Sequence, residues 1–252
     1  RFFQLLKKSM RANFQVEARV PERKHGYGLT AEAVRSILAA KPDLLITLDN
    51  GIAAHDALDG LAQAGVECIV VDHHHVGGGL PRAVAVINPK RNDSRYPFNE
   101  LCGAGISFKL AWALAVHFSQ NRKVTPEFRA FLLDAVALAG CGTIADIVPL
   151  AGENRVLAHQ GLLAFARTRA PGLRALLKAS KIEGTPRVSD VGFRIGPRIN
   201  AAGRCGEAAQ ALELLLTEDD ARAAELAAIL EAHNAERQNI ECRILEEARQ
   251  QA

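Results

Sequence analysis

Three consecutive histidines follow an aspartate in the segment Asp72-His73-His74-His75. In an extended chain alternate side chains share a face, so members of such a run can converge on one point. Imidazole and carboxylate together suit Mn, Fe or Zn better than Mg or Ca. The alternative is a polar loop of solvated histidines. The apolar run CIVV before the cluster, the GGG after it and a second acidic segment at Asp49, after LLITL, favour a metal site.

The elements that would position these residues are short apolar runs that alternate with helical periodicity. Such alternation predicts an α/β fold with a parallel sheet and helices on both faces. In open α/β sheets, ligands bind outside the carboxyl ends of the strands. Asp49 and Asp72 each end a predicted strand, so both clusters are expected at one edge of the sheet. The predicted strands are 15–21, 44–51, 66–75 and 83–89, and the predicted helices 31–40 and 53–65.

From about residue 100 the sequence predicts a mainly helical region. A stretch with glycines and a proline, GFRIGPRINAAGR (192–204), breaks the helical pattern and is expected to be a loop. The segment 217–251 contains neither Gly nor Pro and would form one helix of about 50 Å. We therefore expect one domain at 1–216 and a connecting helix at 217–252. The expected helices of this half cover 106–118, 128–140 and 154–167.

Composition gives only a general indication of the class of protein. The chain has 252 residues, 48% of them hydrophobic, and a net charge of +3, which neither demands nor excludes a nucleic-acid partner. The five cysteines form no CxxC pair, which is typical of core thiols in a reducing compartment. No uncharged apolar run approaches 18 residues and no signal peptide is visible, so a cytoplasmic protein without a membrane partner is expected.

A further carboxylate, Asp146, lies in GCGTIADIVPL, where the pattern predicts the end of a helix and a turn before Pro149. By itself it could equally be a capping or turn aspartate. Its importance comes from its context. The segments TLDNGI, VVDHHH, GTIADIVPL and GPRINAAGR follow the order and approximate spacing of the motifs of the RecJ family in the DHH phosphoesterase superfamily. PERKHGYGL also resembles that family's early glycine-rich segment, so the resemblance covers nearly the whole chain.

The resemblance implies two divalent ions, Mn²⁺ or Mg²⁺, bridged by a carboxylate. Asp49 would be the bridging ligand, and His73 and Asp146 would be ligands of one ion. His74 would lie near the scissile phosphate, and Asp72 would orient the histidines. Two ions about 3.5–4 Å apart suit phosphodiester hydrolysis, because they generate the nucleophile and neutralise charge at both reacting oxygens. Asp49, His73 and Asp146 should therefore converge, whereas the third histidine receives no role.

Arginine and asparagine side chains in RINAAGR are candidates for holding phosphate oxygens. Guanidinium groups match phosphate geometry, and the glycine allows close approach of the backbone. A surface loop with incidental arginines is the alternative. These candidates should face the cleft of His74. They are Arg198, Asn200 and Arg204, with Arg23 as a weaker one.

Two glycines, Gly103 and Gly105, precede a predicted helix. Their backbone amides could bind an anion. Tight packing against the sheet is an equally good interpretation.

The sequence departs from the family pattern at its beginning. The family's first motif carries paired aspartates, but no aspartate precedes Asp43 here. The chain also starts at Arg1 rather than Met, so we expect a core fragment that lacks this motif and the family's smaller C-terminal domain. Such a fragment should fold but should be poorly active on its own, because the remaining ligands cannot hold two ions.

The resemblance implies a 5′→3′ exonuclease on single-stranded DNA in repair and recombination, with a single-strand-binding protein and a helicase as possible partners. One alternative is a phosphodiesterase of short oligonucleotides or cyclic dinucleotides, against which the GPRINAAGR segment and the long terminal helix argue. A second is a catalytically inactive DHH scaffold, against which the retained Asp49, His73, His74 and Asp146 argue.

Overall fold

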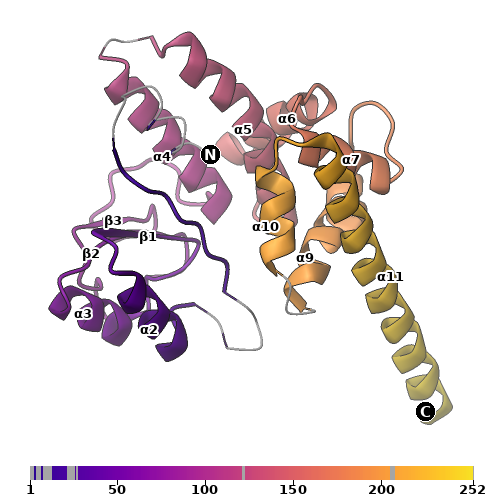
Figure 1. Cartoon of the computed structure of the whole chain (residues 1–252), viewed down its shortest axis with the longest axis horizontal. Coiled ribbons are helices and arrows are strands. Elements are labelled where there is room, and N and C mark those ends of the chain that lie inside the picture. Colours follow the sequence, from indigo (N-terminus) through magenta and orange to yellow (C-terminus); the bar gives the residue numbers. More distant parts are fainter. Residues whose placement is uncertain are drawn as a thin grey trace. The chain divides into compact units, whose positions relative to one another are not determined.

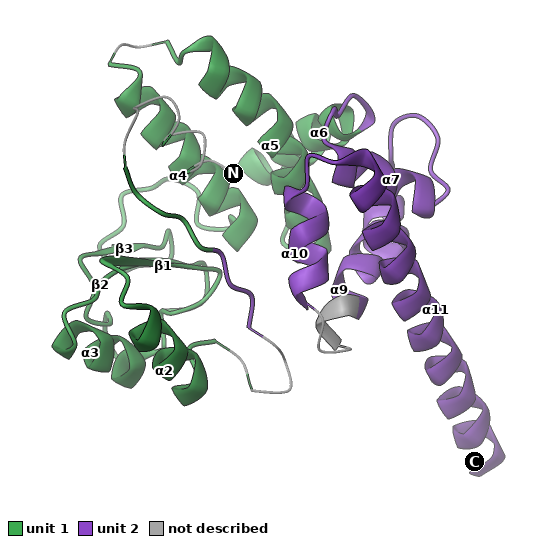
Figure 2. Ribbon diagram, viewed as in Figure 1, with its two compact units in different colours: residues 1–17, 25–165 green, residues 18–24, 166–252 purple. Residues whose placement is uncertain are grey.

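The computed structural model describes residues 3, 7, 13–21, 26, 28–120, 123–204 and 208–251; for 202–204 it describes only the backbone. Contacts within the chain define two compact units (Figure 2). Unit 1 comprises residues 1–17 and 25–165, and unit 2 comprises residues 18–24 and 166–252. The expected division between residues 216 and 217 does not coincide with this grouping, because the long C-terminal helix packs against the other helices of unit 2.

Unit 1 contains a parallel sheet of three strands in the order β1 (Leu44–Leu48), β2 (Glu67–Val71), β3 (Ala85–Ile87). The register pairs Leu48 with Val71 and Val71 with Ile87, so the three strands end level with one another. The residues that follow them therefore emerge at one edge of the sheet. This arrangement confirms the predicted parallel sheet and sets its carboxyl edge as the place where polar side chains collect.

Helices cover both faces of this sheet, as the sequence predicts (Figure 1). On one face, β2 side chains Cys68 and Val70 pack with α2 (Ala31–Ala40) and α3 (His55–Gln63). On the other face, Val71 packs with Ile106 of α4 (Gly103–Phe118). Successive side chains of a strand point to opposite faces, which explains why β2 is apolar throughout.

Two longer helices, α5 (Pro126–Ala145) and α6 (Gly152–Ala166), extend the second layer of unit 1. α5 begins after Thr125, whose hydroxyl accepts a hydrogen bond from the Phe128 amide, and Pro126 occupies its first turn. By length and composition α5 could cross a membrane, but 44% of its apolar window is buried inside the protein. Its apolarity therefore matches that of a core helix, and is weak evidence for a membrane span.

The backbones of α5 and α6 approach each other at two glycines, which yields a stability prediction. A Cβ atom on Gly140 would lie 2.6 Å from the Leu157 carbonyl oxygen and 2.8 Å from Gly161 Cα. Because backbone cannot move aside cheaply, Gly140→Ala should lower the free energy of unfolding by about 1–3 kcal/mol. Gly60→Ala in α3 is the matched control. No atom lies within 4 Å of its added Cβ, so it should raise stability by roughly 0.5–1 kcal/mol. Thermal or denaturant unfolding measures both, and equal effects would contradict the proposed glycine contact.

In the described part of unit 2, all the regular secondary structure is helical. Its long helix, α11 (Asp220–Gln251), buries Leu226, Leu230 and Asn234 against its neighbours, whereas residues 238–251 are exposed. The first half of α11 is thus part of a packed unit and the second half projects from it (Figure 1). The other elements are α7 (Pro171–Ala179), α8 (Val188–Asp190), the π-helix η2 (Val191–Ile195), α9 (Gly196–Arg204) and α10 (Ala208–Leu216).

Two expectations about local structure are wrong. The alternating segment 15–21 forms no strand, because its side chains from 15 to 21 are exposed and no strand pairs with it among the described residues. The segment 192–204 is helical rather than a loop. Pro197 lacks an N–H and its ring would collide with the carbonyl four residues earlier in a regular α-helix. The wider π-helical turn of η2 lies immediately before it and accommodates the proline.

Candidate metal centre

Asp49 is the first residue after β1, and its backbone is held in an uncommon conformation. Its N–H donates to the Val71 carbonyl oxygen at 2.9 Å, which extends the ladder between the first two strands. Its φ angle is 64°, a left-handed value that aspartate tolerates better than most residues. The chain therefore turns sharply at Asp49 while the carboxylate, 54% exposed, remains at the sheet edge.

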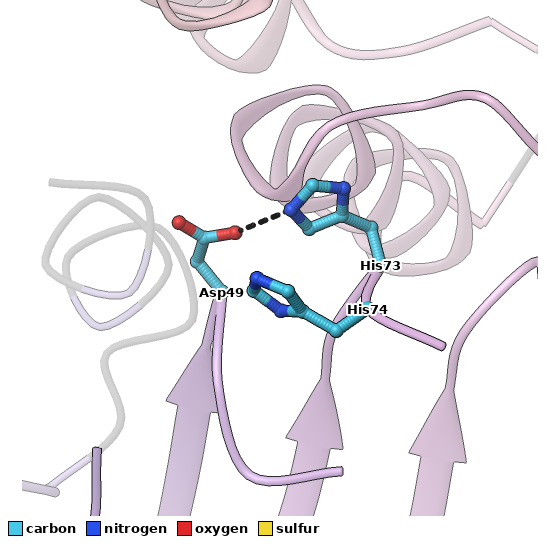
Figure 3. A group of neighbouring side chains, drawn as sticks. All are labelled: Asp49, His73 and His74. Atoms are coloured by element: carbon cyan, nitrogen blue, oxygen red, sulfur yellow. Dashed lines mark ion pairs between the residues drawn. The ribbon is translucent and has the colours of Figure 1, made fainter. Parts of the chain in front are cut away.

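Three side chains from distant segments converge here. His73 Nε2 lies 3.1 Å from Asp49 Oδ1 and 3.5 Å from Asp146 Oδ2. Asp146 caps the C-terminus of α5 directly after Ala145, at the helix end that its sequence context predicts. Figure 3 shows the His73 ring pointing at the Asp49 carboxylate, with the His74 ring beside it. Ligand atoms of Asp49, His73 and His74 all lie within 4.8 Å of one another. The predicted convergence of Asp49, His73 and Asp146 is confirmed.

Asp72 organises the turn that carries both histidines. It is 1% exposed, and its carboxylate accepts hydrogen bonds from the backbone N–H groups of Ile52, His73 and His74, at 3.0, 2.7 and 3.2 Å. Its Oδ1 also lies 2.6 Å from His74 Nδ1. Asp72 thus contacts the ring of His74 but only the backbone of His73, so the imidazole it can orient is that of His74. Burial opposes ionisation of Asp72, yet these hydrogen bonds hold its pKa below the usual value.

Two further residues shape the centre: Asn88, which the sequence did not single out, and Gly103, whose role the sequence left open. Asn88 follows β3, is buried, and donates from Nδ2 to the His74 carbonyl oxygen at 2.9 Å. The rule that located Asp49 and Asp72 at strand ends would also have located Asn88. Gly103, the first residue of α4, lies so close to Asp49 that a Cβ atom would be 2.2 Å from Asp49 Oδ1. Of the two interpretations of Gly103, the geometry favours tight packing, here against the carboxylate itself.

The electrostatics of the cluster suit a cation. The hydrogen bond with Asp49 raises the pKa of His73, and the Coulombic fields of Asp49 and Asp146 act in the same direction against the desolvation of the ring. Burial raises the pKa of Asp146, and the Asp49 charge adds to this, while His73 opposes it. A divalent ion would relieve the repulsion between the two carboxylates. Carboxylate and imidazole donors at this separation fit Mn²⁺, Fe²⁺ or Zn²⁺.

The structure places the candidate phosphate-binding residues in different settings. In unit 2, Arg198 ion-pairs with Glu231 of α11 and donates from Nη1 to the Arg194 carbonyl oxygen at 2.6 Å. Asn200 is exposed on α9. The Arg204 side chain and Arg23 lie outside the described residues. In unit 1 the third histidine, His75, is exposed. Whether the arginines face the cleft of His74 stays a prediction.

Asp49 and His73 at the carboxyl edge of a parallel sheet, with Asp146 beside them at the end of α5, define this chain as an α/β protein with a candidate divalent-metal centre. Residues 2–139 match the family model described as the DHH family, N-terminal domain. The chain belongs to the DHH family. Residues Asp49, His73 and His74 lie inside the matched range, whereas Asp146 follows it.

Relatives of known name are similar over most of this chain. It is 42% identical over 246 residues to the single-stranded-DNA-specific exonuclease RecJ of Dickeya dadantii, covering 93% of this chain and 42% of that protein. It is 41% identical over 236 residues to RecJ of Bacillus subtilis, covering 93% and 28%. A crystal structure of exonuclease RecJ bound to manganese superposes with a TM-score of 0.80 at 40% identity, covering 93% of this chain and 57% of that one. The chain thus spans less than half the length of these two curated relatives.

Proposed function

We propose that this chain forms the catalytic core of a Mn²⁺-dependent exonuclease that degrades single-stranded DNA in the 5′→3′ direction during repair and recombination. The observation that carries the proposal is the convergence of Asp49, His73 and Asp146 on one point at the carboxyl edge of the sheet. The similarity to RecJ exonucleases over 93% of the chain supports the substrate class. The RecJ structure bound to manganese supports the choice of metal.

In this proposal each residue of the centre has one task. Asp49 would bridge two ions in the intact enzyme, and His73 and Asp146 would be ligands of one of them. When bound, the ions supply a hydroxide at neutral pH and neutralise the phosphate oxygens. Asp72 fixes the tautomer of His74 through Nδ1, so that Nε2 is the nitrogen directed toward the scissile phosphate.

Residues of unit 2 would bind the DNA backbone. Glu231 holds the guanidinium of Arg198, which would keep one side of the arginine fixed while another N–H binds phosphate. Asn200 is exposed, so its side-chain amide is accessible to a phosphate from the solvent side. We assign Arg204 and Arg23 the same role on the sequence alone. If these residues bind phosphates, affinity for DNA should fall steeply as salt concentration rises.

The alternatives make different predictions about substrates. The test is cleavage of end-labelled long single strands, duplexes and dinucleotides by the full-length protein with Mn²⁺. The proposal expects preferential loss of nucleotides from the 5′ end of long single strands. Preferential hydrolysis of dinucleotides would instead support an oligonucleotide phosphodiesterase. A purified protein that neither contains nor binds Mn²⁺ would support an inactive scaffold.

We further propose a cytoplasmic location, where the cysteines remain reduced. Four of them, Cys68, Cys102, Cys141 and Cys242, are free in the structure, and the first three are buried. Burial raises the pKa of the Cys141 thiol to about 12, so it remains a protonated core residue. We also propose a single-strand-binding protein and a helicase as partners. Co-purification with either protein tests this part of the proposal.

A further inference from the structure

Ile147, the residue after Asp146, combines two unfavourable features. The residue is 88% exposed, more than any other large hydrophobic residue in the described part of the chain. Its φ angle is 59°, in the left-handed region where a β-branched residue is a genuine outlier. The other described non-glycine residues with positive φ are Lys41, Asp49, Gln120 and Lys181, none of which is β-branched. Neither burial nor backbone preference explains an isoleucine at this position.

The surrounding structure enforces the strained conformation. On one side, the Asp146 N–H donates to Gly142 O at 2.9 Å and the Ile147 N–H to Ile144 O at 3.2 Å, which closes the last turn of α5. On the other side, the buried amide of Asn154 donates to the Pro149 carbonyl oxygen at 3.0 Å. A left-handed residue at the end of a helix is usually glycine or asparagine. Strain that the fold maintains in this way is typical of functional positions.

The position of Ile147 relative to the metal centre suggests what its side chain contacts. Asp146 Oδ2 lies 3.5 Å from His73 Nε2, and consecutive Cα atoms are about 3.8 Å apart. The distance between Ile147 and the point where a scissile phosphate would bind is therefore no longer than one nucleotide. A phosphate at that point brings its own sugar and base with it, and both offer apolar surface to an exposed isoleucine.

We propose that Ile147 packs against the sugar and base of the nucleotide whose phosphate occupies the metal centre, which strengthens the binding of single-stranded DNA there. This inference rests on the proposed function and deepens it by naming a substrate-contacting residue. An aliphatic side chain offers no hydrogen bond to a base edge, so the contact holds any of the four nucleotides. It therefore suits an enzyme that removes nucleotides successively without regard to sequence.

The test separates substrate binding from stability by predicting opposite effects. Ile147→Asn should raise Tm by about 2–4 °C, because asparagine adopts the left-handed conformation with less strain. The same variant should raise KM for single-stranded DNA about fivefold to tenfold, with kcat and the Kd for Mn²⁺ nearly unchanged. Ile147→Leu, which keeps an aliphatic side chain, should have the same KM as the unsubstituted protein. Leu133→Gln, which replaces a 57% exposed leucine of α5, is the matched control and should leave KM unchanged.

Each other outcome would overturn the inference in a recognisable way. An unchanged KM in Ile147→Asn, in an enzyme that cleaves single strands, would show that Ile147 does not contact substrate. A lower Tm would show that the side chain packs against protein, and weaker Mn²⁺ binding would show that the strain serves the metal ligand. If the unsubstituted full-length protein neither binds nor cleaves single-stranded DNA, the proposed function fails, and this inference fails with it.

Discussion

Replacing Asp49 by Asn should slow Mn²⁺-dependent cleavage of single-stranded DNA by more than about 10³-fold, the largest effect that we expect from any single change. Loss of one preorganised electrostatic group in an active site typically costs 10²–10³-fold. The loss should be greater here, because the proposed bridging carboxylate would hold both ions that generate the hydroxide. The backbone should tolerate the change, since asparagine accepts the φ of 64° at this position at least as well as aspartate.

The measurement combines steady-state cleavage, Mn²⁺ titration calorimetry and thermal unfolding of the full-length protein. Asp59→Asn removes the same charge from the exposed surface of α3 and is the matched control. The control should retain both metal affinity and activity. Undiminished Mn²⁺ affinity and activity in Asp49→Asn would exclude Asp49 as a ligand, whatever the similarity to RecJ proteins.

Gly103→Ala should lower activity about 10²-fold although it replaces no proposed metal ligand. The added Cβ would lie 2.2 Å from Asp49 Oδ1 and 2.5 Å from its Cγ, so the carboxylate must move. Displacement of a reacting group by about 1 Å can cost 10²-fold in rate. The Kd for Mn²⁺ should rise in parallel, because the displaced group is the proposed bridging ligand.

Gly105→Ala in the same turn of α4 is the matched control. Its added Cβ would meet Leu101 and Leu157 side chains at 3.4 Å, an ordinary van der Waals distance. Both substitutions remove a glycine from the start of one helix, so they share any effect on helix formation. If the two variants bind Mn²⁺ equally well, the contact between Gly103 and Asp49 does not govern the centre. A loss of activity that follows the loss of folded protein would lead to the same conclusion.

The sequence alone predicts the frame of the site. The apolar runs before Asp49 and Asp72 are short, strongly β-forming and separated by helical periodicity, so they predict parallel strands whose ends share an edge. Residue chemistry predicts the metal class, because imidazole and carboxylate donors restrict the ions that fit. The end of α5 at Asp146 is also predictable, since the apolar periodicity stops at a turn before Pro149. Each of these features depends on neighbours along the chain.

Tertiary structure alone decides how close these segments come. Asp146 reaches His73 because α4 and α5 pack on the sheet through Val71, Ile106 and Ala139, contacts between residues far apart in sequence. The same packing determines that Gly103 must lack a side chain. Segment 15–21 shows the converse, because its alternating pattern predicts a strand but no sheet partner meets it among the described residues. A local pattern determines which face of an element can be buried, but what lies against that face depends on packing between distant segments.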